Sequence, residues 1–170
     1  MSRGPGRIER VIETAFSDEP NRTFTIDELV PIAYPGLNRP GKRHLIAILR
    51  AAHKAAARLG WHCWPSERPC HHIVFVNVCN VRSYAIGRLR IDSRHYNDLL
   101  YKIERLLDDP ELQNSKWHLV QPGGLWWEYA QSFTAEHKAR MAGDGNRADQ
   151  IARDRAEQTR QHRREAGFEK

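Results

Sequence analysis

The sequence predicts an α+β fold that is mainly helical, and three observations lead to that prediction. Apolar residues recur every three to four positions in several segments, which is the spacing of helices that bury one face. The stretch HHIVFVNV, residues 71–78, is rich in aliphatic and β-branched side chains and predicts a strand. No stretch approaches the roughly 20 apolar residues that cross a bilayer, so no membrane partner is expected.

Three helices are expected in the N-terminal third of the chain. The first covers residues 7–16, RIERVIETAF, where the apolar residues fall on one stripe. The second begins at Thr25, because TIDE fits the Thr-x-x-Glu capping box. Pro31 lies inside this helix and removes a backbone donor, which predicts a short or kinked helix. The third covers about residues 40–59 and precedes a glycine, a natural helix terminator.

A hairpin and a further helix are expected to follow. Residues 61–64 are expected to pair with the strand at 71–78. Residues 79–92 give no clear pattern, whereas a helix with one apolar face is expected over about 93–107. Residues 117–133 are too rich in aromatic side chains to stay exposed, so they should dock on the core or on a second subunit.

A chain of 170 residues can bury one core with room for an appendage. The sequence predicts a folded unit over residues 1–78, a helical and aromatic accessory or dimerisation segment over 79–142, and a flexible charged tail over 143–170. Ile151 and Phe168 are the only large apolar residues of the tail. We therefore expect the tail to bury no face of its own, and to be a solvated or nascent helix or disordered.

The positive charge of the chain is concentrated in one segment. The sequence has 27 Lys and Arg against 21 Asp and Glu, a formal net charge of +6. After Glu28 the next carboxylate is Glu67, and the cations between them equal the whole excess. They are Arg39, Lys42, Arg43, Arg50, Lys54 and Arg58. An ordinary solvated helix would carry mixed signs, so this pattern favours a polyanionic partner over a plain surface.

At about 100° per residue, the last four of these cations form one stripe opposite the apolar face of the third helix. Ala47, Ala51 and Ala57 lie between them, so no bulky side chain is expected on that side. Small residues let a helix approach a partner closely while long cations reach phosphates or base edges. The B-DNA major groove admits such a helix, and Arg pairs bidentately with guanine.

Residues 7–78 resemble a winged helix-turn-helix domain. The resemblance is carried by RIERVIETAF, TIDELVPIA, KRHLIAILRAAHKAAARLG and the hairpin WHCWPSERPCHHIVFV. It implies three helices plus a β-hairpin wing, with the third helix in the major groove and the wing on the flanking backbone or minor groove. The DNA-binding residues that it implies are Lys42, Arg43, Ala47, Arg50, Lys54 and Arg58, with Arg68 at the tip of the wing.

The stretch WHCWPSERPCHH raises the question of a zinc site. Its candidate ligands are His62, Cys63, Cys70, His71 and His72, since thiolate and imidazole are the usual zinc ligands. A hairpin could bring Cys63 near Cys70 or His72. No Cys-x2-Cys knuckle is present, and adjacent residues on a strand point to opposite faces. The alternative is that the cysteines act as small buried hydrophobes, and no cofactor is expected.

These observations predict a cytoplasmic protein that binds double-stranded DNA, a transcriptional regulator rather than an enzyme. The cytoplasm is expected from an odd number of cysteines and an N-terminus without a secretory apolar core. A homodimer through residues 93–133 is possible, as is a monomeric core completed by the same segment. The rival functions are a winged-helix module that binds another protein and a metal-dependent nucleic-acid enzyme. The acidic residues are scattered, which disfavours the enzyme.

Overall fold

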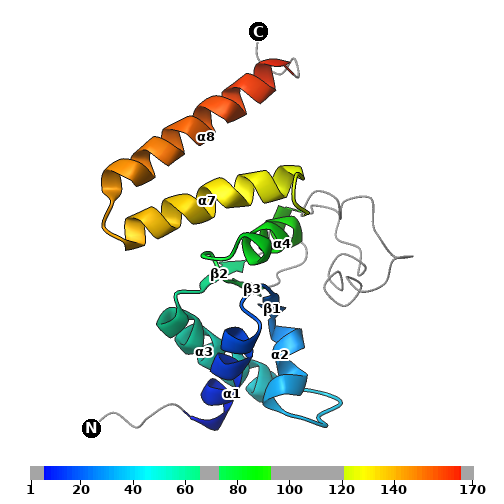
Figure 1. Cartoon of the computed structure of the whole chain (residues 1–170). Coiled ribbons are helices and arrows are strands. Elements are labelled where there is room, and N and C mark those ends of the chain that lie inside the picture. The colour runs from blue at the N-terminus through cyan, green and yellow to red at the C-terminus, as the bar shows by residue number, and fades with distance from the viewer. Residues whose placement is uncertain (1–5, 66–72, 93–120, 166–170) are drawn as a thin grey trace.

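A computed structural model describes residues 6–65, 73–92 and 121–165 of the chain (Figure 1). The fold is α+β and mainly helical, as predicted. None of the helices in these ranges is both long enough and apolar enough to cross a membrane. The elements are α1 (Arg7–Asp18), β1 (Thr23–Thr25), α2 (Ile26–Ala33), α3 (Lys42–Leu59), β2 (His62–Pro65), β3 (Ile73–Val76), α4 (Val81–Asp92), α7 (Leu125–Met141) and α8 (Gly145–Glu165).

Several predictions fall on residues outside those ranges. They are the helix over about 93–107, the larger part of the dimerisation segment 93–133, and the wing tip with Arg68. The predicted hairpin is confirmed, because β2 and β3 pair antiparallel with Trp64 opposite Val74. In the described part of the chain, β1 adds a third strand that the sequence did not predict, in the order β1–β3–β2.

The sheet separates two layers of helices (Figure 1). Side chains alternate across a strand, so neighbouring residues of β3 serve different cores. Phe75 faces α1, α2 and α3, where Phe16 stacks on Trp61 with ring centroids 4.4 Å apart. Val74 and Val76 face α4 and α7 instead. The strands of the N-terminal segment therefore share a core with the segment that follows them.

Helix α4 fits closely against the second face of the sheet. A Cβ atom added to Gly87 would lie 2.7 Å from Val76 Cγ2, so only glycine allows this approach. Tyr84 meets the Trp64 ring edge-on at 5.1 Å and stacks on Phe133 of α7 at 5.3 Å. The aromatic-rich stretch thus docks on the core through Phe133, one of the two alternatives that the sequence left open.

A buried ion pair ties α4 to the start of α2. The Arg90 guanidinium donates two hydrogen bonds to the Glu28 carboxylate, at 3.1 and 2.9 Å, and the two side chains are 1% and 6% exposed. Glu28 also completes the predicted capping box, accepting a bond from the Thr25 backbone N–H at 2.8 Å. Burial raises the pKa of Glu28, but the bonds from Arg90 and Thr25 outweigh burial and hold that pKa below its ordinary value.

The segment predicted as a flexible tail contains α8, which packs antiparallel against α7. Ala148 is fully buried, and the Arg155 guanidinium carbon lies 3.5 Å from the Phe133 ring centroid. Arg155 also donates a hydrogen bond to Glu136. Most described side chains of α8 are exposed, so of the predicted alternatives the structure shows a solvated helix, with a narrow contact on α7. Small residues and a cation stacked on an aromatic ring provide the contact that large apolar residues usually provide.

Candidate nucleic-acid interface

Helix α3 packs through its small residues. Ala51, Ala52, Ala55 and Ala56 are all buried, together with Ile48, against α1, α2 and the sheet. Gly60 ends the helix in the left-handed conformation, at φ 71°. The sequence placed Ala51 among alanines that face a partner, but it is 7% exposed. That prediction is wrong, because alanines let α1 come close to α3.

The opposite face of α3 is open to solvent. Its exposed residues are Lys42, Arg43, Ile46, Arg50, His53, Lys54 and Ala57. Arg43 and Arg50 form no ion pair with any described residue. They lie two turns apart on the same side of the helix, about 10 Å along its axis. Ile46 and His53 were not predicted for this face, because the predicted apolar stripe was rotated around the helix from the face that is buried.

Arg58 and Ala47 lie away from this open face. Arg58 donates to Glu13 Oε2 at 2.7 Å and also bonds Glu9, so it joins α3 to α1. Hydrogen bonds to both carboxylates raise the pKa of Arg58, and the Arg58 hydrogen bond lowers the pKa of Glu13. Ala47 is half-buried and turned toward α1. The prediction that Arg58 belongs to the reading surface is not supported by this placement, because both its partners lie on α1.

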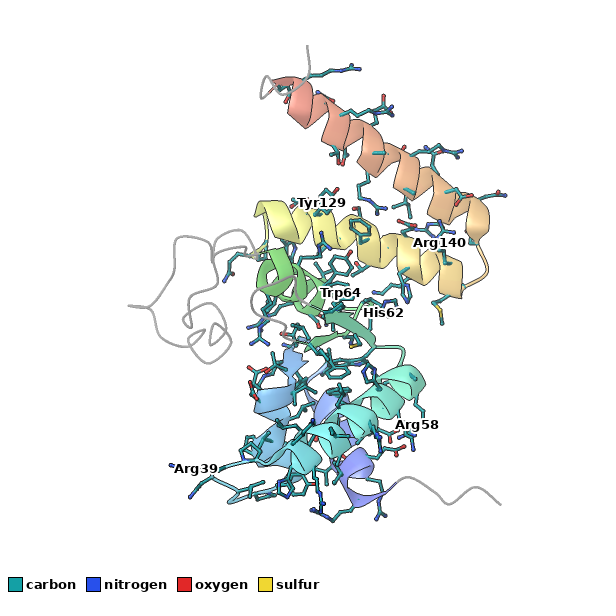
Figure 2. All side chains as sticks on the ribbon, turned by 180° about the vertical axis from the view of Figure 1, so that it is seen from behind. Arg39, Arg58, His62, Trp64, Tyr129 and Arg140 are labelled. Carbon is teal, nitrogen blue, oxygen red and sulfur yellow. The ribbon has the colours of Figure 1, made fainter. Side chains whose placement is uncertain are left out.

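Lys54 stands at the edge of the open face. Its Nζ lies 3.8 Å from Glu9 Oε2, yet 69% of its side chain is exposed. A pair this long and this exposed contributes little to stability, so the ammonium remains accessible to another anion. Arg39 is also exposed, and Figure 2 shows it projecting from the connection between α2 and α3.

A groove of about 550 Å³ runs between the start of α1 and the middle of α3. Cations stand on both walls, Arg7 on α1 and Arg50 with Lys54 on α3. The remaining lining residues are Gly6, Ile8, Glu9, Tyr34, Ala47 and Ala51. Arg7 was not predicted as a functional residue, since its relation to α3 depends on a contact between distant segments. The groove extends the positive surface of α3 onto α1.

The candidate zinc ligands do not converge within the described residues. His62 lies on the sheet face toward α7, with its ring 5.5 Å from that of His137, and burial with the nearby His137 lowers the pKa of His62. Cys63 points to the other face of the sheet and is the strand partner of Phe75. The Cys63 sulfur lies 3.9 Å from His53 Nε2. Burial raises the pKa of the Cys63 thiol. Among described residues no three His, Cys, Asp or Glu side chains are grouped to hold a metal.

The other three candidate ligands, Cys70, His71 and His72, lie outside the described residues. The observed register pairs Cys63 with Phe75 and Pro65 with Ile73. The suggestion that the hairpin brings Cys63 near Cys70 or His72 falls on residues outside the described ranges and stays a prediction. His62 and Cys63 also point to opposite sides of the sheet, so these two neighbours do not share one metal site.

Comparison of the chain with protein-family models, with curated proteins and with solved structures found no match. The function of this chain therefore has to be inferred from its own residues.

Proposed function

We propose that this protein binds double-stranded DNA through the open face of α3, as a winged-helix transcriptional regulator without catalytic activity. The observation that carries the proposal is the pair of exposed arginines, Arg43 and Arg50, on a helix that has no carboxylate of its own. The carboxylates of α1 that reach this helix, Glu9 and Glu13, engage Arg58 and, loosely, Lys54. Arg43 and Arg50 therefore remain available to an external anion.

The order of the elements supports the winged-helix part of the proposal. Helix, strand, two helices and a β-hairpin follow one another, and the sheet has the order β1–β3–β2. In that arrangement the third helix exposes to solvent the side that does not pack on the first two helices. The accessory helices α4 and α7 cover the other face of the sheet and leave α3 uncovered (Figure 1).

The cations divide into two groups by position on the surface. Arg43 and Arg50 lie on the open face between Lys42 and Lys54, where their guanidinium groups would reach guanine O6 and N7. Lys42 and Lys54 flank them, and Arg7 and Arg39 stand outside α3 altogether. These four cations would contact phosphates, which fix the position of a protein on the duplex without reading sequence. The groove between α1 and α3 would then lie along one DNA strand.

The rival proposal is a winged-helix module whose partner is another protein. Exposed cations would suit an acidic protein surface as well as DNA. Binding to DNA and binding to an acidic protein differ in their dependence on salt, because a duplex offers a regular row of phosphates and releases bound counterions. A homodimer would fit a regulator that binds two half-sites, and it remains a prediction.

The test is fluorescence anisotropy of a labelled mixed-sequence duplex, with the wild type and two charge-reversed variants. Arg43→Glu with Arg50→Glu removes the central cations. Arg160→Glu with Arg164→Glu is the matched control, because it changes the net charge equally on α8, at the far end of the molecule from α3 (Figure 1).

We expect the α3 variant to lose binding by at least tenfold and the α8 variant to stay within about threefold of the wild type. Circular dichroism must show that both variants remain folded. Equal losses of duplex affinity in the two variants would show that only net charge matters, and would contradict a specific α3 interface. An absence of duplex binding by the wild type at low salt would contradict the proposal itself.

A further inference from the structure

Ile46 is an unexpected side chain on the open face of α3. It is 38% exposed, and the only other large hydrophobic residues exposed among the described ones are Leu59 and Met141, at helix ends. A single exposed apolar residue is common on protein surfaces. Ile46 differs in its surroundings, because the rest of this face consists of cations, a histidine and an alanine.

Ile46 occupies the angular centre of this face. At about 100° per residue, His53 and Ala57 lie within about 20° of it. Arg50 and Arg43 lie about 40° and 60° to one side, and Lys42 about 40° to the other. Arg43 stands about 4.5 Å before Ile46 along the helix axis and Arg50 about 6 Å after it. Ile46 therefore lies between Lys42 and the two arginines around the helix, and between Arg43 and Arg50 along it, so a partner that contacts all three cations also covers Ile46.

Burying Ile46 against a purely polar surface would gain little, whereas burial against an apolar group is favourable. The floor of the DNA major groove offers one such group, the C5-methyl of thymine. Every other recognition feature of that groove is a hydrogen-bond donor or acceptor. The two arginines that flank Ile46 match the guanine acceptors of the same groove.

We propose that Ile46 is a specificity-determining residue that packs on a thymine methyl group, while Arg43 and Arg50 pair with guanines on either side. This inference rests on the proposed DNA binding. With base pairs 3.4 Å apart along the duplex, the axial offsets place each guanine one to two base pairs from the thymine. The ligand is thus duplex DNA in which a T·A pair lies between nearby G·C pairs.

The first step of the test is selection of bound duplexes from a randomised library, with the wild type and with Ile46→Ala. The wild type is expected to enrich thymine flanked by guanine at one or two base pairs. Ile46→Ala is expected to keep the guanines and lose the thymine. Leu59→Ala is the control, because Leu59 is 36% exposed on the same helix but on its other side.

The second step replaces that one thymine by deoxyuridine in the enriched duplex, which removes only the methyl group. Affinity of the wild type should fall about fourfold, from the loss of one buried carbon. Affinity of Ile46→Ala should not change, and Leu59→Ala should behave as the wild type.

The outcomes separate the two proposals. Salt-dependent duplex binding by the wild type that is equally tight with thymine and deoxyuridine would overturn the role of Ile46 and leave the proposed function standing. A wild type that binds no duplex at any salt concentration would overturn both, and would direct attention to a protein partner with an apolar pocket for Ile46.

Discussion

The buried ion pair between Glu28 and Arg90 is expected to stabilise the packing of α4 against the unit formed by α1, α2 and α3. Glu28→Gln removes the carboxylate charge that faces the Arg90 guanidinium, whose side chain is 1% exposed. Removing one partner of a buried ion pair costs about 3–5 kcal/mol. In a chain of this size, that corresponds to a fall in Tm of roughly 6–20 °C. Glu28→Gln with Arg90→Met should recover most of the loss, because a buried pair and an apolar pair are often equally stable.

Chemical denaturation at pH 7 of the wild type, both single variants and the double variant gives the coupling free energy directly. The same pair predicts a dependence on pH. The folded state holds the pKa of Glu28 below its ordinary value of 4.5, so the ionised form favours folding. That contribution is present above pH 4.5 and is lost as the pH falls through the lower folded-state value. Glu28→Gln should lack this acid-dependent component. Two single variants that each cost under about 1 kcal/mol and add without coupling would refute the reasoning.

Three further variants test separate parts of the structure. Arg58→Ala should lower the Tm, because it removes the Arg58 hydrogen bonds to Glu9 and Glu13 of α1, while the salt dependence of the proposed DNA binding stays the same; a shallower salt dependence would place Arg58 on the DNA. Gly87→Ala should cost about 1–3 kcal/mol in denaturant unfolding, since its Cβ would overlap Val76, and an unchanged midpoint would contradict the close approach of α4. Ser83→Ala should cost about 1–3 kcal/mol, because the buried hydroxyl accepts from the Asn77 N–H at 2.9 Å; slower hydrogen exchange at Asn77 in the variant would contradict this.

The parts of the fold that the sequence predicted are those with a one-sided local pattern. The apolar stripe of residues 7–16, the capping box at Thr25 and the apolar run at 73–76 can each be recognised within one short stretch of sequence. Helix α4 was not predicted because it lies between the sheet and α7. Ser83, Tyr84, Ala85, Ile86 and Gly87 are consecutive and all buried, so no polar face alternates with an apolar one. The short β1 has no alternation to detect.

The candidate site was predicted in outline, and its details required tertiary contacts. Local spacing places Arg50, Lys54 and Arg58 on one stripe, but it cannot show that Glu9 and Glu13 approach Arg58 from another helix. The apolar face was centred near Leu45 because large residues were given most weight. The buried face is instead centred on the alanines that α1 covers, roughly 60° around the helix from Leu45. This rotation exposes Ile46 and His53.

The two layers separate α7 and α8 from the open face of α3. Helices α7 and α8 lie on the side of the sheet away from the open face of α3 (Figures 1 and 2). A partner bound to α8 would therefore leave the proposed DNA-binding face free. The arginines of α8 are far from α3, which fits the use of Arg160 and Arg164 as controls for net charge.

The salt dependence of duplex binding tests the proposed function most directly. Lys42, Lys54, Arg7 and Arg39 are the cations that we assign to phosphates, and each phosphate contact adds about −0.9 to the slope of log K against log salt. Four contacts predict a slope of about −3.6 for the wild type, from anisotropy titrations of a mixed-sequence duplex. A slope between about −3 and −4 would agree with this account. A slope near zero, or no binding even at low salt, would contradict it.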